Sequence, residues 1–238
     1  MSNFIYGTNV CIAAIESGYP IKNIYIEENN HRFISYVRSK TVPYVIVRKE
    51  QLNQVNELHQ GVMMEIDSFK TYDLNDVIRK QETADFNRAL LLILDGLEDP
   101  HNFGAVLRIA DAAGVDGIIY RKTRSVKLNA TVVRVSTGAA FYVKCVEAVN
   151  LTAAIKNLKS FGYWIVGAEA ATESIDFRSI KYDMATALVI GSEGRGLSRL
   201  VKDNCDYLVQ IPMFGHINSL NAAVAAGVLT YHIKGDQN

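Results

Sequence analysis

The sequence contains few of the residues from which several common kinds of site are built. Its three cysteines, Cys11, Cys145 and Cys205, lie far apart and form no CxxC pair, so neither a disulfide framework nor a metal site is expected. Separated thiols in odd number are typical of a reduced, cytoplasmic protein. No stretch approaches the roughly 20 apolar residues that span a bilayer. The start, MSNFIYGTNV, lacks the basic and apolar regions of a secretory signal.

The sequence also lacks net charge, because 25 basic residues balance 25 acidic ones. Zero net charge argues against a nucleic-acid partner, but the charges are unevenly distributed. Residues 67–99 hold four basic and eight acidic side chains, whereas residues 101–144 hold seven basic and two acidic ones. A local basic patch can follow phosphates on a neutral molecule. A solvated surface is the alternative that charge alone leaves open.

Helical and strand patterns alternate along two parts of the chain. In the first part, helices are expected at 6–18, 31–40 and 49–58, and strands at 23–28, 44–48 and 62–69. A polar stretch of mixed charge follows, and a second alternation begins at Ala89 with the apolar run ALLLILDGL. The sequence therefore predicts an α/β protein with an accessory domain at 1–69, a linker at 70–88 and a mostly parallel sheet in a domain at 89–238.

In a parallel sheet, ligands bind beyond the carboxyl ends of the strands. Three loops follow predicted strands there. In the first, LDGLEDPHNFGAVLR, Asn102 stands where a helix N-cap is expected, and Arg108 lies in an otherwise apolar helix. A capping residue and a surface arginine are the alternative interpretation.

The second loop, VIGSEGRGLSRL, has three glycines in six residues and permits close backbone approach to a ligand. It matches neither GxGxxG nor a Walker loop, which disfavours a nicotinamide-dependent enzyme. The third, QIPMFGHINSLNAAVAAG, places Ser219 and Asn221 at the mouth of a helix of small residues. N-capping by Ser219 is the plain alternative, and we interpret His216 as an ordinary loop residue.

These three loops together resemble the SpoU/TrmH family of the SPOUT methyltransferase superfamily. The matching residues, in the family's order and spacing, are Asn102, Gly104 and Arg108, then Gly191, Ser192, Glu193, Gly194, Gly196 and Leu197, then Ile211, Pro212, Met213, Ser219, Leu220 and Asn221. The segments IYGTNVCIAAIESG and HQGVMMEI resemble the ends of an accessory RNA-binding domain in one branch. That branch includes the enzyme that methylates a guanosine ribose in 23S ribosomal RNA. The family fold implies a carboxyl-terminal trefoil knot and a homodimer.

The resemblance also implies the reaction, the transfer of a methyl group from S-adenosylmethionine to a ribose 2′-oxygen of RNA. Because a guanidinium barely deprotonates, we expect Arg108 to stabilise the developing alkoxide and grip the adjacent phosphate. The residues expected to position it, the ribose and the loop are Asn102, Glu193, Ser219 and Asn221. The residues expected to line the cofactor pocket are Gly191, Gly196, Ile211, Met213 and Leu220. The basic residues expected to contact RNA phosphates are Arg121, Lys122, Arg124, Lys127 and Arg134.

Two other functions stay open at this point. One is the same chemistry on a transfer RNA or on another nucleotide, which the accessory domain disfavours. The other is a non-catalytic RNA-binding relative, which the intact motifs disfavour. In every case the expected partner is RNA, and neither a metal ion nor a membrane is expected.

Overall fold

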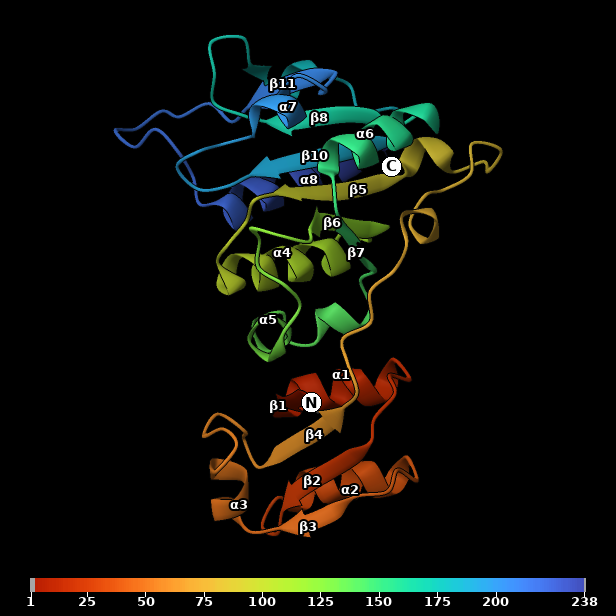
Figure 1. Cartoon of the computed structure of the whole chain (residues 1–238), viewed down its shortest axis with the longest axis vertical. Helices are drawn as coiled ribbons and strands as arrows, with labels where there is room; N and C mark the ends of the chain where they lie inside the picture. The colour runs from red at the N-terminus through yellow and green to blue at the C-terminus, as the bar shows by residue number, and fades with distance from the viewer. Residues whose placement is uncertain (1–2, 238) are drawn as a thin grey trace. The chain divides into compact units, whose positions relative to one another are not determined.

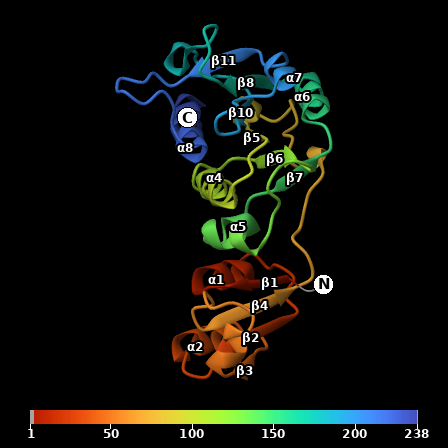
Figure 2. The same cartoon turned by 60° about the vertical axis from the view of Figure 1, so that its left-hand side comes forward.

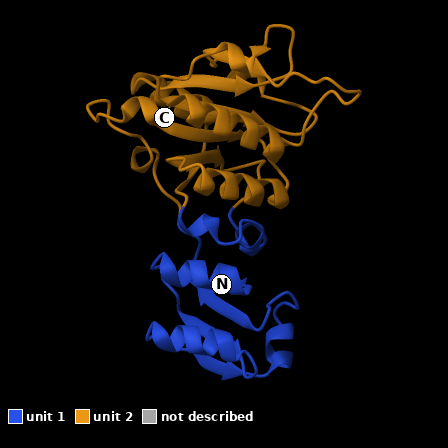
Figure 3. Cartoon of the chain, turned by 180° about the vertical axis from the view of Figure 1, so that it is seen from behind, with its two compact units in different colours: residues 1–70, 128–142 blue, residues 71–127, 143–238 orange. Residues whose placement is uncertain are grey.

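The protein is described by a computed structural model over residues 3–237, and its contacts divide the chain into two compact units (Figure 3). Unit 1 comprises residues 1–70 and 128–142, and unit 2 comprises residues 71–127 and 143–238. Each unit has its own sheet. Residues 128–142, which the alternation predicts within the second domain, are grouped with unit 1 because Val133 packs into its hydrophobic core.

Unit 1 is a small α/β fold with a four-stranded sheet in the order β1-β4-β2-β3 (Figure 1). Strand β4 is antiparallel to both β1 and β2, and only β2 and β3 are parallel. Its elements are β1 (Asn3–Tyr6), α1 (Thr8–Glu16), β2 (Asn23–Glu27), α2 (His31–Ser39), β3 (Val45–Val47), α3 (Lys49–Asn53), β4 (Val62–Ile66), α5 (Ala130–Val135) and the 3-10 turn η3 (Ala139–Phe141).

The start of unit 1 differs from the predicted pattern. We expect a helix from Tyr6, but residues 3–6 form β1, and the helix begins at Thr8. Gly7 makes the turn between them with a φ of 99°, a conformation that glycine adopts without steric cost. Strand β1 is stabilised by pairing with β4, about sixty residues away, and a local pattern carries no trace of that pairing.

Unit 2 is built on a seven-stranded sheet in the order β7-β6-β5-β10-β8-β11-β9, in which every pairing is parallel. The strands are β5 (Leu90–Asp95), β6 (Gly117–Arg121), β7 (Cys145–Ala148), β8 (Trp164–Ala168), β9 (Ile175–Asp176), β10 (Thr186–Gly191) and β11 (Tyr207–Gln210). The helices are α4 (Pro100–Ala112), α6 (Leu151–Ser160), α7 (Arg199–Lys202) and α8 (Ala222–Gln237), with 3-10 turns η1 (Leu74–Asp76), η2 (Phe86–Arg88) and η4 (Phe177–Ser179).

Helices cover both faces of this sheet, as the parallel arrangement requires. Helices α4 and α8 lie side by side on one face, and α6 and α7 lie on the other (Figures 1 and 2). All six residues of β5 are buried, which accounts for the uninterrupted apolar run from Leu90 to Leu94. The parallel α/β fold is therefore confirmed. The short strand β9 is absent from the predicted pattern, and the knot stays a prediction.

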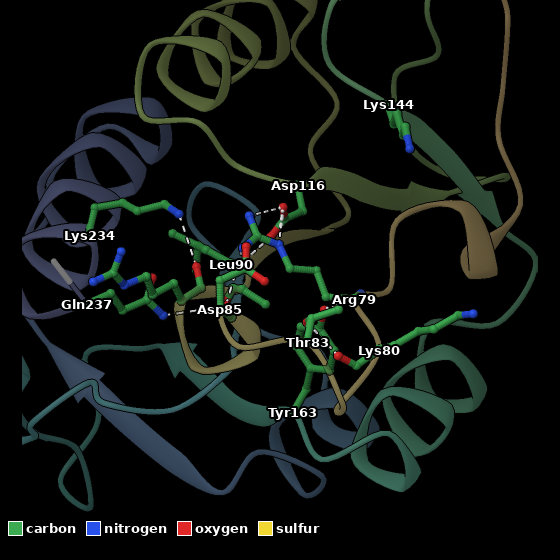
Figure 4. Close-up of polar contacts among 12 residues, drawn as sticks. Arg79, Lys80, Thr83, Asp85, Leu90, Asp116, Lys144, Tyr163, Lys234 and Gln237 are labelled. Carbon is green, nitrogen blue, oxygen red and sulfur yellow. Dashed lines mark hydrogen bonds and ion pairs between the residues drawn. The ribbon is translucent and has the colours of Figure 1, made fainter.

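The polar stretch before β5 is attached to unit 2 by a cluster of ion pairs and hydrogen bonds (Figure 4). The guanidinium of Arg79 donates to Asp116 Oδ1 from Nε at 2.7 Å and pairs with Asp85 at 2.6 Å. The other carboxylate oxygen of Asp116 accepts the backbone N–H of Leu90 at 2.9 Å. The hydroxyl of Tyr163 accepts the backbone N–H of Arg79, and desolvation raises the pKa of this hydroxyl. These contacts fix the entry of the chain into β5.

Within residues 3–237, no helix is long and apolar enough to cross a membrane. The same part of the chain contains no group of three or more His, Cys, Asp or Glu side chains placed to hold a metal ion.

Candidate active site

A cavity of about 670 Å³ opens at the carboxyl ends of the central strands of unit 2. The register pairs Gly191, the last residue of β10, with Asp95, the last residue of β5. Two of the loops that the sequence singles out, those after β10 and β11, line this cavity and so meet at the same edge of the sheet. The cavity is lined from residues 168–170, 190–196, 209–213 and 218–229.

The loop after β10 folds back tightly on itself. Ser192 and Gly196 exchange backbone hydrogen bonds of 3.1 and 3.0 Å. A Cβ atom on Gly191 would overlap the carbonyl group of Gly196, so no larger residue fits there without moving the loop. Gly194 and Gly196 have positive φ angles of 77° and 63°, where glycine is favoured. Because of these glycines, the backbone of the loop itself, without intervening side chains, forms one side of the cavity.

Two carboxylates, the buried Asp95 and the partly buried Glu169, anchor the end of this loop. Asp95, whose side chain is 1% exposed, accepts the backbone N–H of Ser198 at 2.7 Å and pairs with Arg121 at 2.6 Å. Arg121 in turn donates to the Ser198 hydroxyl at 2.8 Å. On the other side, Glu169 accepts the backbone N–H of Leu197 at 2.9 Å. The loop is therefore fixed to the ends of β5, β6 and β8.

A second group of polar side chains joins all three loops beside the cavity. Asn221 Nδ2 donates to Asn102 Oδ1 and to Glu193 Oε1, each at 2.8 Å. Asn102 Nδ2 donates to the same Glu193 oxygen at 3.0 Å. Three residues that are distant in sequence thus form one connected network. Because the Glu193 carboxylate accepts two of these bonds, it orients both amides.

The helix caps at the site differ from those expected. Asp99, not Asn102, caps α4, because its side chain accepts the His101 N–H at 2.9 Å while Pro100 occupies the first turn. Asn102 is consequently buried inside the first turn and is free to bond to Glu193. At α8, Asn221 rather than Ser219 accepts the backbone N–H groups of Ala223 and Val224, at 3.0 and 3.3 Å.

The structure brings together most of the predicted site residues. Those lining the cavity are Gly191, Glu193, Gly196, Ile211, Met213, Ser219, Leu220 and Asn221. Arg108 does not line it: its side chain is exposed on α4, and no hydrogen bond or ion pair is recorded for it within the part of the chain described.

The predicted RNA contacts are divided between environments. Lys122, Arg124 and Lys127 are exposed on unit 2, as a phosphate contact requires. Arg121 is bound to Asp95 and Ser198, and Arg134 lies in unit 1. The sequence analysis does not predict Glu169 or the Asp95–Arg121 pair as part of the site, although both carboxylates lie at the carboxyl ends of strands.

Comparison with known proteins agrees with this arrangement. The SpoU rRNA Methylase family matches residues 89–231, and the family described as RNA 2′-O ribose methyltransferase substrate binding matches residues 4–72. A protein of Staphylococcus haemolyticus, strain JCSC1435, is 43% identical over 96% of this chain and 94% of its own. A protein of Staphylococcus aureus, strain MSSA476, is 42% identical over the same shares. Both are named for the TrmH family of tRNA/rRNA methyltransferases.

Solved structures share the fold at lower identity. The SpoU methyltransferase AviRb from Streptomyces viridochromogenes, 24% identical, superposes with a TM-score of 0.85 over 99% of this chain and 90% of that one. The AdoMet-bound rRNA methyltransferase from Sinorhizobium meliloti, also 24% identical, gives a TM-score of 0.81 over 98% and 87%. With both units matched and 43% identity to a curated relative, this chain belongs to the SpoU rRNA methylase family of RNA methyltransferases.

Proposed function

We propose that this protein transfers a methyl group from S-adenosylmethionine to a ribose 2′-oxygen of ribosomal RNA, and that the target is a guanosine of 23S rRNA. The observation that supports this most strongly is the Asn102–Glu193–Asn221 network, which lies beside a cavity walled by the glycine-rich loop. The bound cofactor would supply a methyl group on a sulfonium, which is a good leaving group.

The cavity fits such a cofactor in size and lining. Its volume of about 670 Å³ lies within the range of roughly 300–1,000 Å³ typical of small-molecule sites. Ile211, Met213 and Leu220 supply apolar walls, and Gly191 and Gly196 let the backbone of the loop approach a bound molecule closely. Gly191 is required for this arrangement, because a side chain at that position would displace the backbone of Gly196.

The polar network would hold the acceptor nucleotide and the loops in register. Asn102 and Asn221 are oriented by Glu193 before any substrate arrives, and such preorganised groups need no rearrangement in the transition state. Ser219 lines the cavity next to them, and its hydroxyl would bond to the ribose. We assign Arg108 to the RNA side, where its charge would stabilise the alkoxide and grip the adjacent phosphate.

We propose that the protein works as a homodimer. Val224, Val228 and Tyr231 are spaced four and three residues apart on α8 and are 51, 39 and 55% exposed. That spacing places them on one helix face, and an apolar stripe of this kind favours a protein contact. Ile109, next to Arg108 on α4, packs at Gly227 of α8. A second copy on this stripe would therefore adjoin Arg108.

We propose that Lys122, Arg124 and Lys127 contact RNA phosphates from unit 2. All three are exposed and follow β6, whose carboxyl end lies at the same sheet edge as the cavity. Their charge would give an affinity that falls as salt rises. Unit 1, which matches a substrate-binding family, would select the RNA.

Mapping of ribose methylation tests this proposal. The purified protein is incubated with methyl-labelled S-adenosylmethionine and either 23S ribosomal RNA or total transfer RNA. Nuclease digestion and mass spectrometry should reveal 2′-O-methylguanosine at one position of the ribosomal RNA. Label in transfer RNA alone would overturn the assignment of the target, and label on bases alone would overturn the reaction.

A further inference from the structure

A second cavity, of about 520 Å³, lies entirely within unit 1. It is lined by parts of the segments 6–10, 57–61 and 134–137, together with Glu27 and Lys49. Its volume again suits a small molecule or a single nucleotide. The segments IYGTN and HQG, at opposite ends of the unit's sequence, thus meet at one place.

One wall of this cavity is held in a single strained conformation. His59 is 3% exposed, its Nδ1 accepts the Gly61 N–H at 2.8 Å, and its Nε2 donates to Asn53 at 2.9 Å. Gln60 is held at a φ of 53°, which a residue with a side chain rarely adopts. Its Oε1 accepts the backbone N–H of Thr8 at 3.0 Å. Backbone strain that the surroundings enforce in this way is typical of binding sites.

In the part of the chain that the structure describes, the charged side chains of this cavity form no ion pairs with one another. Arg134 Nε is buried and has no hydrogen-bond partner within the described residues, whereas buried polar atoms are almost always satisfied. Glu27, Lys49 and Glu57 line the same cavity, and no ion pair joins them to one another or to Arg134. An acceptor on a ligand would satisfy the Arg134 nitrogen.

The mixture of charges indicates which ligand fits. A site for phosphate alone would gather donors, but this cavity also presents the carboxylates of Glu27 and Glu57. The edges of guanine offer the complementary set, with acceptors at O6 and N7 for a guanidinium and donors at N1 and N2 for a carboxylate. Building on the proposed RNA methylation, we propose that this cavity takes the base of an unpaired guanosine in the RNA substrate.

Binding of defined RNA hairpins to the full chain tests the proposal. Four fluorescein-labelled hairpins share one stem and an adenosine-rich loop in which a single nucleotide is guanosine, adenosine, uridine or cytidine, and fluorescence anisotropy measures their affinities. The guanosine hairpin should bind tightest. Glu27→Gln should weaken it about tenfold and remove the preference, because one bidentate base contact is lost. Glu28→Gln, an exposed neighbour outside the cavity, should change the affinity less than twofold.

Arg134→Gln provides the second test, in which its affinity for the guanosine hairpin should fall. Lys40→Gln, which removes one charge at an exposed site, is the control and should keep that affinity. Thermal unfolding of each variant separates loss of binding from loss of folding, and Glu27→Gln keeps the test valid if Arg134→Gln does not fold. Equal affinity for all four hairpins, or equal effects of Glu27→Gln and Glu28→Gln, would overturn the proposal. If wild-type protein methylates ribosomal RNA and either of these results is found, only the cavity assignment fails. If it discriminates between hairpins without transferring methyl groups, only the proposed function fails.

Discussion

Replacing Asp95 with asparagine should loosen the loop after β10. The carboxylate of Asp95 holds Arg121 through one oxygen and the Ser198 N–H through the other. Asparagine has the same shape, but its NH2 group can only donate. It would therefore face either the guanidinium or the Ser198 N–H, and one of the two anchors would be lost. The change also leaves Arg121 without its counter-ion.

The structure sets the size of this effect. Removing one partner of a buried ion pair costs about 3–5 kcal/mol. The Arg121 side chain is 33% exposed and can be partly solvated after the change, so we expect a lower cost of about 2–3 kcal/mol. For a chain of this length each kcal/mol lowers the melting temperature by about 2–4 °C, which predicts a decrease of about 4–12 °C.

Asp116→Asn is the matched control. Asp116 also pairs with an arginine, Arg79, and also accepts a backbone N–H, that of Leu90 (Figure 4). It precedes β6, however, at the end of the sheet opposite the cavity. Both variants should lose comparable stability by calorimetry. Only Asp95→Asn should weaken S-adenosylmethionine binding, by at least tenfold in an isothermal titration, because it releases a loop that lines the site. Equal cofactor affinities in the two variants would refute the anchoring argument.

Three further predictions concern other parts of the molecule. Asn221→Ala removes the cap of α8 and two hydrogen bonds of the network, so it should lower the free energy of unfolding by about 1–2 kcal/mol in a denaturant titration. It should also lower the single-turnover rate of methyl transfer more than the cofactor affinity. An unchanged rate would contradict the network's role. Burial raises the pKa of Cys145 and Cys205 to about 12, so at pH 8 the fraction of each thiol present as thiolate should be about 10⁻⁴. Iodoacetamide should therefore modify the two cysteines only after the protein unfolds. Rapid labelling of the folded protein would contradict this burial. Tyr231→Glu should convert the proposed dimer to a monomer in light scattering, whereas Val149→Glu, at an 84% exposed position away from α8, should not. A wild-type monomer would contradict the proposed interface.

The sequence predicts strand β5 of unit 2 well because local burial determines it. The run from Leu90 to Leu94 is apolar without interruption, and a strand covered by helices on both faces requires that pattern. The Gly-rich loop is also evident, since it follows the buried strand β10, and the residues around Asn221 are evident because they follow a predicted strand and precede a helix. Strands β1 and β9 escape prediction because four and two residues carry too little pattern, and distant partners stabilise them.

Partnerships between side chains are harder to predict than the elements that carry them. Arg121 belongs to a basic stretch and is therefore predicted to contact RNA, yet β6 places it beside the buried carboxylate of Asp95. Glu169 stands at the end of β8 and bonds to the loop after β10. Both partnerships depend on the order of strands in the sheet, in which β10 lies between β5 and β8. That order is a tertiary property and leaves no local signal in the chain.

The central claim is that the cavity at the carboxyl ends of β8, β10 and β11 binds the methyl donor, and a calorimetric titration with S-adenosylmethionine tests it most directly. Wild-type protein should bind one cofactor per chain. Gly191→Ala should abolish binding because its Cβ would overlap Gly196, and Gly235→Ala, where a Cβ would meet nothing within 4 Å, should bind as wild type does. Wild-type protein that binds no cofactor, or Gly191→Ala protein that binds it normally, would contradict the account.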